Sequence, residues 1–246
     1  RRVDNRVHLL KGRDANKDQS YFLHAVNETD FADVLFPIGG MTKAAVRDRA
    51  RDAGLEVAEK KDSTGICFIG ERPFTEFLSE YLPANPGQIK DPGGRVVGEH
   101  GGLAYYTLGQ RQGLNIGGLA AYGPQAWYVA AKDHENNDLI VVQGTDHPLL
   151  YQNWLTAGTV HWINGPPAGW PEIAPLRCRA KTRYRQPDQA CTVTPASDDA
   201  LEVSFERPQR ALTPGQYVVF YRGEHCLGGA TIQAADMQTA ALEAAG

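Results

Sequence analysis

The sequence predicts an α+β, multi-domain fold, with helices confined to its first third and short strands in the rest. Two observations lead to this prediction. Up to about residue 85, apolar residues recur at helical spacing between loop signals. Beyond it, short apolar runs alternate with turns rich in Gly, Pro, Asn and Asp, which is typical of small β-barrels. At 246 residues the chain is long enough for two or three small domains, each with its own core.

Helix signals of unequal strength precede residue 85. The clearest segment begins at Thr42, a predicted N-cap, and ends at Gly54, a predicted C-terminal stop. Residues 17–26 also carry apolar side chains at helical spacing, and residues 73–83 predict a second short amphipathic helix. Residues 55–60 are predicted to be extended.

Hairpins dominate the remainder of the chain. The first is predicted to turn at Asp91–Gly94, the second at His134–Asp138, and the third spans residues 176–195. Further strands follow from about residue 201. Residues 163–175, rich in Pro and Gly, are expected to form a long surface loop.

Composition and charge narrow the classes of function. The formal net charge is −4, so any nucleic-acid contact has to come from a local basic patch. The sequence shows no signal peptide and no apolar run of about 18 residues, so we expect no membrane partner and a cytoplasmic location. The four cysteines form no CxxC pair and show no metal-site spacing, which favours a reducing compartment and no structural metal.

The stretch RCRAKTRYR places a positive residue at every second position. In a strand all of these side chains would project from one face, where nucleic-acid phosphates would neutralise them. The alternative, of about equal weight, is a solvated face balanced by carboxylates from neighbouring strands. Because the protein is acidic elsewhere, RNA is favoured. The positive residues are Arg177, Arg179, Lys181, Arg183 and Arg185.

Cys67 stands in a loop-forming stretch, KDSTGICFIGER. The cationic side chains of Lys60, Lys61 and Arg72 would lower the pKa of its thiol. Such a cysteine can act as a nucleophile or carry a transferred sulfur. An inert loop cysteine is the alternative and the commoner case. The other three cysteines lie in strand patterns and are predicted to be small core residues.

Two other stretches have simple structural explanations. Asp18, in KDQSYF, precedes a helical run, where capping is the more frequent role of an aspartate. The stretch YYTLGQRQGLNIGG matches neither a GxGxxG pattern nor a Walker loop. A glycine-rich connection between β segments is therefore the simpler interpretation of it.

Nine strings, taken together and in order, resemble the tRNA-specific 2-thiouridylase family (MnmA/TrmU type) from about residue 8 to residue 232. The resemblance implies the end of an α/β nucleotide-binding (PP-loop) domain at 1–72 with the catalytic cysteine loop. A small β-rich central domain at 73–150 and a tRNA-binding, translation-factor-like β-barrel at 151–246 follow. The strings are NKDQSYFL, LFPIGG, KKDSTGICFIGER, FLSEYLPANPGQI, GEHGGLAYYTLGQRQGL, WYVAAKD, KTRYRQ, TPGQYVVFY and CLGG.

The activity implied by the resemblance is that of a tRNA uridine 2-sulfurtransferase. In the family, ATP is used to adenylate the C2 oxygen of the wobble uridine, and a cysteine persulfide, loaded by a sulfur-donor protein, then delivers sulfur. The persulfide carrier of the family's GICF motif matches Cys67, and Asp62 in the same motif is a candidate to assist. Adenylation makes the oxygen a good leaving group for attack by a polarisable sulfur.

The family's tRNA contacts match three short motifs here: a lysine-aspartate-glutamine motif, an arginine-tyrosine pair inside the basic stretch, and the glutamine of a PGQ turn. For Asp18 this implied role overrides the preference for capping, although the two roles do not exclude each other. The matching positions are Lys17, Asp18, Gln19, Arg183, Tyr184 and Gln216.

The sequence departs from the family pattern in one respect: it contains neither the SGGxDS-type loop that binds ATP nor the N-terminal cysteine partner. We expect both to precede Arg1 in an intact protein, so that a missing N-terminal region binds most of the ATP. This chain alone would then carry sulfur and touch tRNA without adenylating it. Two alternatives are a non-catalytic tRNA/RNA-binding module with an idle Cys67 and a thiol oxidoreductase built around that cysteine.

Overall fold

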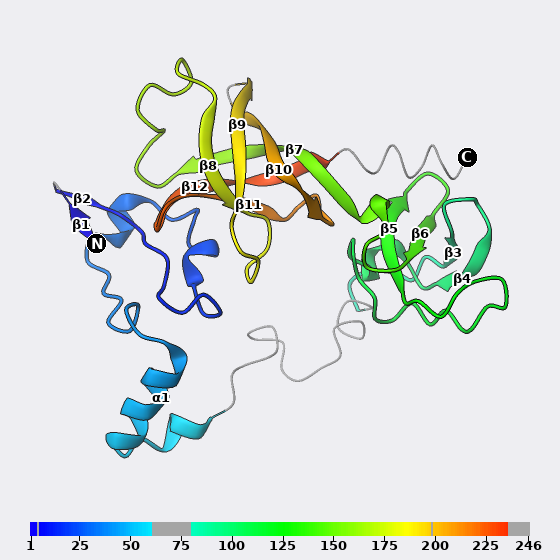
Figure 1. Cartoon of the computed structure of the whole chain (residues 1–246), viewed down its shortest axis with the longest axis horizontal. Coiled ribbons are helices and arrows are strands. Elements are labelled where there is room, and N and C mark those ends of the chain that lie inside the picture. The colour runs from blue at the N-terminus through cyan, green and yellow to red at the C-terminus, as the bar shows by residue number, and fades with distance from the viewer. Residues whose placement is uncertain (4, 61–79, 198, 236–246) are drawn as a thin grey trace. The chain divides into compact units, whose positions relative to one another are not determined.

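The computed structural model describes residues 1–3, 5–60, 80–197 and 199–235, and the chain divides into two compact units (Figure 1). The barrel unit combines an N-terminal segment, which the structure describes up to residue 60, with residues 154–207 and 214–234. Among the described residues, the sheet unit comprises residues 80–153 and 208–213, together with residue 235. Cys67, Asp62 and most of the predicted helix at 73–83 lie outside the described residues.

A closed six-stranded barrel, in the order β10-β7-β12-β11-β8-β9, forms the centre of the barrel unit. In β10, Leu201, Val203 and Phe205 are buried and the residues between them exposed, as expected for a strand with one face on a core. The predicted hairpin at 176–195 is confirmed, because β8 and β9 pair antiparallel. The strands are β7 (Tyr151–Trp162), β8 (Leu176–Lys181), β9 (Gln189–Ser197), β10 (Ala200–Arg210), β11 (Tyr217–Arg222) and β12 (His225–Ala235).

Strand β11 is buried on both faces, because the N-terminal segment covers the outside of the barrel there. Val219 and Tyr221 pack with Leu9 and Tyr21 of that segment in one apolar cluster. Main-chain hydrogen bonds join the same two regions: the Lys11 N–H donates to the Glu224 carbonyl, and the Cys226 N–H donates to the Leu9 carbonyl, each at 2.9 Å. The N-terminal segment is thus an integral layer of the barrel unit.

The predicted helix from Thr42 to Gly54 is confirmed as α1 (Lys43–Asp52). The Thr42 hydroxyl accepts a hydrogen bond from the Ala45 N–H at 3.3 Å, and Gly54 adopts φ +67°, which completes the C-terminal stop.

Two other predictions for the N-terminal segment are wrong. Residues 17–26 hold a single 3₁₀ turn, η1 (Gln19–Tyr21), followed by turns. Tyr21 packs against β11 on the outside of the barrel, and the helix does not continue. Residues 55–60 form a 3₁₀ helix, η3 (Glu56–Glu59), and not an extended strand. Glu and Ala are depleted in strands, which agrees with this outcome. The remaining short elements are β1 (Arg2–Val3), β2 (Arg6–Val7) and η2 (Glu28–Phe31).

The sheet unit contains a four-stranded sheet in the order β4-β3-β6-β5. Both hairpins predicted here are confirmed, and a parallel pairing of β3 with β6 joins them. At the first turn, the Asp91 carboxylate accepts hydrogen bonds from the Gly93 and Arg95 N–H groups. The elements are β3 (Gly87–Lys90), β4 (Val96–His100), η4 (Leu103–Tyr105), β5 (Trp127–Asp133), β6 (Asp138–Gln143) and η5 (Pro148–Leu150).

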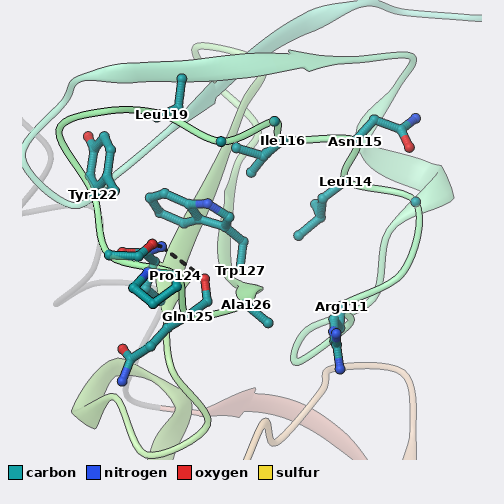
Figure 2. Close-up of a pocket in the computed structure, with 15 residues that line it drawn as sticks. Arg111, Leu114, Asn115, Ile116, Leu119, Tyr122, Pro124, Gln125, Ala126 and Trp127 are labelled. Carbon is teal, nitrogen blue, oxygen red and sulfur yellow. Dashed lines mark hydrogen bonds between the residues drawn. The ribbon is translucent and has the colours of Figure 1, made fainter.

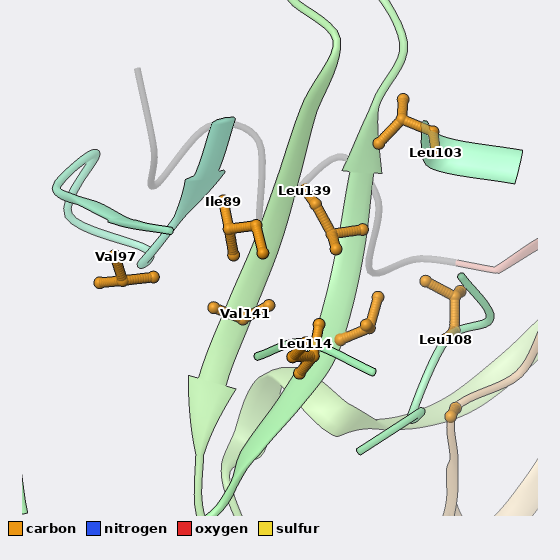
Figure 3. Packing of buried hydrophobic residues seen from close by; sticks show 9 residues of the cluster. Ile89, Val97, Leu103, Leu108, Leu114, Leu139 and Val141 are labelled. Carbon is orange, nitrogen blue, oxygen red and sulfur yellow. The ribbon is translucent and has the colours of Figure 1, made fainter. Parts of the chain in front are cut away.

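The core of the sheet unit is an apolar cluster whose centre is β6 (Figure 3). Leu139 and Val141 are fully buried there and pack with Ile89 of β3 and Val129 of β5. In the barrel unit, the predicted surface loop at 163–175 is confirmed as the connection between β7 and β8.

Candidate functional site

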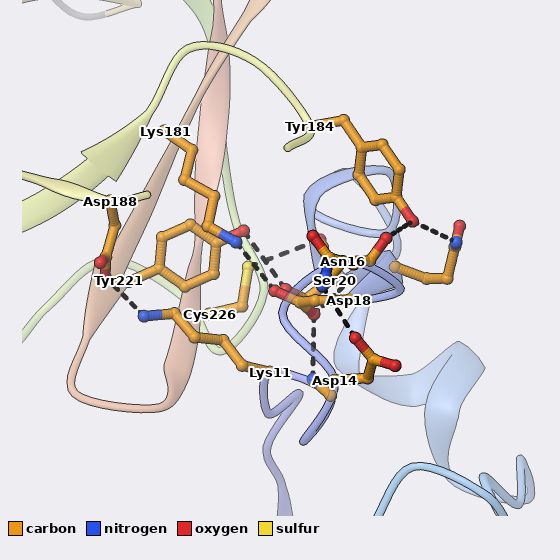
Figure 4. Close-up of polar contacts among 12 residues, drawn as sticks. Lys11, Asp14, Asn16, Asp18, Ser20, Lys181, Tyr184, Asp188, Tyr221 and Cys226 are labelled. Atoms are coloured by element: carbon orange, nitrogen blue, oxygen red, sulfur yellow. Dashed lines mark hydrogen bonds and ion pairs between the residues drawn. The ribbon is translucent and has the colours of Figure 1, made fainter. Parts of the chain in front are cut away.

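Three segments that are remote in sequence meet alongside β8 and β11, and we call this place the loop junction. It consists of residues 11–22, 181–188 and 216–217, all within the barrel unit. Figure 4 shows labelled side chains of the first two segments. Five of the six positions predicted to contact tRNA belong to the first two segments, and Gln216 belongs to the third. The junction therefore brings together all six of them.

A buried ion pair lies at the centre of the loop junction. The Lys181 ammonium donates to the Asp18 carboxylate at 2.9 Å, and the two side chains are 7% and 2% exposed (Figure 4). The other carboxylate oxygen of Asp18 accepts hydrogen bonds from the Gly12 and Ser20 N–H groups at 3.0 and 3.1 Å. Asp18 thus caps η1, as predicted, and also joins the N-terminal segment to β8.

These contacts determine the charge state of Asp18. Burial alone would raise the pKa of its carboxyl. The hydrogen bonds from the Gly12 N–H, the Lys181 ammonium and Ser20 outweigh burial and lower the pKa below its ordinary value. The carboxylate therefore stays ionised at neutral pH, as a buried ammonium needs its partner to be.

The ring of Tyr221 lies next to the ion pair of Lys181 and Asp18. The ammonium groups of Lys11 and Lys181 lie 4.6 and 5.2 Å from its centroid, within the range of cation–π attraction. The Tyr221 hydroxyl lies 3.2 Å from the Ser20 hydroxyl, and Lys11 pairs with Asp188 at 2.5 Å. Burial raises the pKa of Tyr221, so the phenol keeps its proton.

At the surface, a direct side-chain contact joins two of the predicted motifs. The Gln19 amide donates to the Tyr184 hydroxyl at 2.8 Å, over a separation of 165 residues. The Tyr184 hydroxyl in turn donates to the Asn16 carbonyl at 3.4 Å. Gln19 is exposed and Tyr184 half-buried, so both keep polar atoms at the surface.

Tyr21 connects η1 to the third segment of the junction. Its hydroxyl hydrogen-bonds to the Tyr217 carbonyl at 3.0 Å and lies 3.3 Å from the Thr182 carbonyl. Burial raises the pKa of Tyr21 to about 12, so it remains a donor. Gln216, next to Tyr217 and half-buried, is thereby held beside the end of β8.

The prediction of a strand with five basic side chains on one face is wrong in two ways. Strand β8 ends at Lys181, so Arg183 and Arg185 belong to the turn that follows. Lys181 is buried and forms an ion pair with Asp18, and Arg179 lies 3.3 Å from the Asp188 carboxylate. For these two residues carboxylates do balance the charge, as in the alternative, but Asp18 and Asp188 come from the cap of η1 and the turn before β9 and not from neighbouring strands. Arg177 and Arg185 are exposed, and Lys17 and Arg183 are half-buried.

Phe22 was missed by the sequence interpretation. It directly follows η1, and its side chain is 57% exposed although the ring contacts two others. Lys11, Asp188 and Tyr221 were missed as well. One signal could have found Tyr221: the run YVVFY is apolar without alternation, which indicates a strand covered on both faces.

The other cysteines have different environments. Cys191 and Cys226 are buried, as predicted for core residues, and Cys178 is half-buried. The sulfur atoms of Cys178 and Cys191 lie 3.6 Å apart across the β8–β9 pair. The hydrogen bond with Cys178, together with burial, raises the pKa of Cys191.

A separate cleft of about 620 Å³ lies in the sheet unit, along the glycine-rich stretch (Figure 2). The indole of Trp127 lies against Tyr122 in an edge-on contact at 4.9 Å, and Leu114 and Ile116 are on the other side of the indole. None of the six predicted tRNA contacts is among the described residues that line this cleft.

Within the described ranges, no three His, Cys, Asp or Glu side chains come close enough together to hold a metal ion. No helix found among the same residues is both long and apolar enough to span a membrane.

Comparison with known families gives three matches in chain order. Residues 1–71 match the tRNA methyl transferase HUP domain, residues 75–143 the tRNA methyl transferase PRC-barrel domain, and residues 152–232 the aminomethyltransferase beta-barrel domain. The last match coincides with the six-stranded barrel.

Similar curated proteins carry the name tRNA-specific 2-thiouridylase MnmA. The protein from Vibrio cholerae is 56% identical over 92% of this chain and 59% of its own length. Those from Marinobacter nauticus and Chromohalobacter salexigens are 57% and 58% identical over 93% and 94% of the chain. The chain spans about three-fifths of the length of these relatives. From the three domain matches and these relatives, the chain belongs to the tRNA-specific 2-thiouridylase family of MnmA type.

Proposed function

We propose that the chain is the tRNA-binding and sulfur-carrying portion of a cytoplasmic tRNA uridine 2-sulfurtransferase, which replaces the 2-oxygen of the wobble uridine with sulfur. The loop junction is the observation that carries this proposal. Motifs that the chain shares with the family stand up to about two hundred residues apart, yet they meet at one surface. The side chains that these motifs leave at that surface are polar or cationic, as contacts to tRNA require.

The burial of each side chain in the loop junction indicates whether it contacts tRNA directly or positions other residues. Lys17, Gln19, Arg183, Tyr184 and Gln216 keep part of their side chains at the surface, so we assign them to direct contact with tRNA. Asp18 is 1% exposed, so we assign it to positioning. Its carboxylate fixes the turn that presents Lys17 and Gln19, and binds the lysine that ends β8.

Sulfur delivery is assigned to Cys67, with Asp62 to assist. The Cys67 thiolate attacks the outer sulfur of a persulfide on a donor protein, a new S–S bond forms, and the donor's thiolate leaves. Activation of the uridine is assigned to ATP. The sequence has no SGGxDS-type loop, so the residues of this chain do not fit that cofactor.

The tRNA-binding half of the proposal is tested by titrating purified protein into labelled tRNA at several salt concentrations. Arg183→Ala should weaken binding and reduce the slope of log K against log salt by about 1, the amount expected for one lost phosphate contact. Arg222→Ala is the matched control, because Arg222 is exposed at the opposite end of β11 from Tyr217. Equal effects of the two substitutions would refute the assignment of the junction.

The sulfur-carrying half is tested by intact-mass and peptide mapping after incubation with a persulfide donor. One added sulfur on Cys67, removed by reductant and absent from Cys67→Ser, is the expected result. Equal labelling of all four cysteines would contradict it, and tRNA binding without any labelling would leave a non-catalytic tRNA-binding module as the better description.

A further inference from the structure

We propose that Phe22 is a stacking platform for an unpaired base of the tRNA, a role that rests on the proposed function of the loop junction. The ring of Phe22 contacts two other aromatic rings, those of Tyr184 and Tyr21. Its centroid lies 4.6 Å from that of Tyr184, with the rings inclined at 39°. Tyr21 meets it edge-on at 5.4 Å and 84°.

These two rings are themselves fixed. Tyr184 is held through its hydroxyl by Gln19 and the Asn16 carbonyl, and Tyr21 is held through its hydroxyl by the Tyr217 carbonyl. Phe22 is therefore preorganised, so little side-chain entropy remains to be lost when a ligand stacks on it.

The remaining surface of Phe22 is open. The side chain is 57% exposed although both neighbouring rings contact it, so much of the ring has no partner within the barrel unit. A single exposed apolar side chain is common and needs no explanation. Phe22 differs because it immediately follows η1 and packs on Tyr184, both of which carry predicted tRNA contacts.

The exposed ring of Phe22 and the arginines near it fit an unpaired RNA base with its phosphates. Unpaired bases in RNA loops are recognised by stacking on aromatic side chains, with cations nearby for the phosphates. Arg183 stands directly before Tyr184 in the turn, and the Arg185 guanidinium lies 6.0 Å from the Tyr184 ring. The wobble uridine is itself unpaired in the anticodon loop, so the ligand that fits is a base of that loop.

The test compares the wild-type protein with Phe22→Ala, Phe22→Leu and Phe22→Trp in binding to an anticodon stem-loop. Loss of one stacked base weakens binding by about tenfold in comparable systems. We expect this loss for the alanine and leucine variants and near wild-type affinity for the tryptophan variant, because only tryptophan keeps an aromatic face. The salt dependence should stay unchanged, in contrast to Arg183→Ala.

Phe36→Ala is the matched control, since Phe36 is also in the barrel unit and is 52% exposed. It should bind the stem-loop like the wild type. If Phe22→Ala binds as tightly as the wild type, or if Phe36→Ala loses as much, the platform is refuted while the proposed function stands. If the wild-type protein itself does not bind the stem-loop or the tRNA, the proposed function fails first. A melting temperature for each variant shows whether the fold is retained.

Discussion

Lys181 and Asp18, 163 residues apart in the sequence, form an ion pair in the interior of the barrel unit, beneath the surface that carries the predicted tRNA contacts. Because desolvation of both charges is costly, such a pair contributes little net stability compared with apolar residues. What it does contribute is position: the η1 turn and the end of β8 cannot separate without leaving a buried charge alone.

Removal of one partner of this pair should therefore be more damaging than removal of both. We expect Asp18→Asn to destabilise the protein by about 3 kcal/mol, because the Lys181 ammonium is left buried without a counter-ion. The double variant Asp18→Asn, Lys181→Met should regain much of that loss. Urea denaturation of the two single variants and the double variant measures the coupling, and strictly additive losses would contradict it.

The hydroxyl of Tyr184 is predicted to matter for binding more than for folding. Tyr184→Phe removes the hydrogen bond from Gln19 and frees the amide to rotate, while the ring remains in contact with Phe22. We expect a stability change below about 0.5 kcal/mol and several-fold weaker tRNA binding. Tyr105→Phe, which removes an exposed hydroxyl bonded to the Leu82 carbonyl in the sheet unit, is the control and should bind normally.

Acid should weaken the attachment of the first residues of the chain. Hydrogen bonds from the Arg6 and Asn164 side chains and the Val7 N–H lower the pKa of Glu28 to about 2. A carboxyl with a lowered folded-state pKa stabilises the fold fully above its unfolded value, and this contribution is lost as the pH falls towards the folded value. Glu28→Gln should thus flatten the fall in unfolding free energy between about pH 4.5 and 2. Glu202→Gln, at an exposed position on β10, should leave the profile as in the wild type.

Gly228 should tolerate no side chain. It adopts φ +145°, and a Cβ there would overlap the His161 carbonyl on β7. We expect Gly228→Ala to cost at least about 2 kcal/mol of unfolding free energy. Gly215→Ala, at φ +82° with nothing near the added methyl group, should cost only the backbone strain of about 1 kcal/mol. Equal costs would show that backbone strain, and not the contact with β7, explains the glycine.

The paired thiols of β8 and β9 should form a disulfide under oxidation. Cys178 and Cys191 are register partners with sulfur atoms 3.6 Å apart, so a small movement brings them to the bonding distance of about 2.0 Å. In a Cys67→Ser background, oxidised glutathione should first form a mixed disulfide with the more accessible Cys178, and Cys191 should then displace glutathione. Cys178 carries no thiol in the mixed disulfide, but burial still raises the pKa of Cys191, and since the thiolate is the attacking form the second step should accelerate as the pH increases. Intact mass should show the loss of two hydrogen atoms, and a stable glutathione adduct in its place would contradict the internal bond.

Much of the fold could be predicted from the sequence, because its signals are local. The cap at Thr42, the stop at Gly54 and the hairpin turn at Asp91–Gly94 each depend on a few neighbouring residues, and the structure bears them out. The wrong predictions are those in which tertiary contacts override local preference. Residues 17–26 have helical spacing, but the helix does not continue past the η1 turn, and Tyr21 packs with Val219 and Tyr221 of β11.

The candidate site could be predicted only in part, for the same reason. Individual motifs are visible in the sequence, but alternation alone placed Lys181 on a solvent-facing strand face. Its actual partner, Asp18, is determined by the packing of the N-terminal segment on the barrel. The exposure of Phe22 likewise depends on which side chains cover it, which no local pattern records.

The attachment of Leu9–Lys11 to the start of β12 has a consequence for how relatives vary. That attachment uses main-chain atoms, with Leu10 and His225 as bridge partners, so the side chains there can change independently in different relatives. The pair of Asp18 and Lys181 uses charged side chains in a buried place, so a change in one should be accompanied by a change in the other. Both contacts hold the same surface in place, and we expect only the second to leave a correlated pair of positions in aligned sequences.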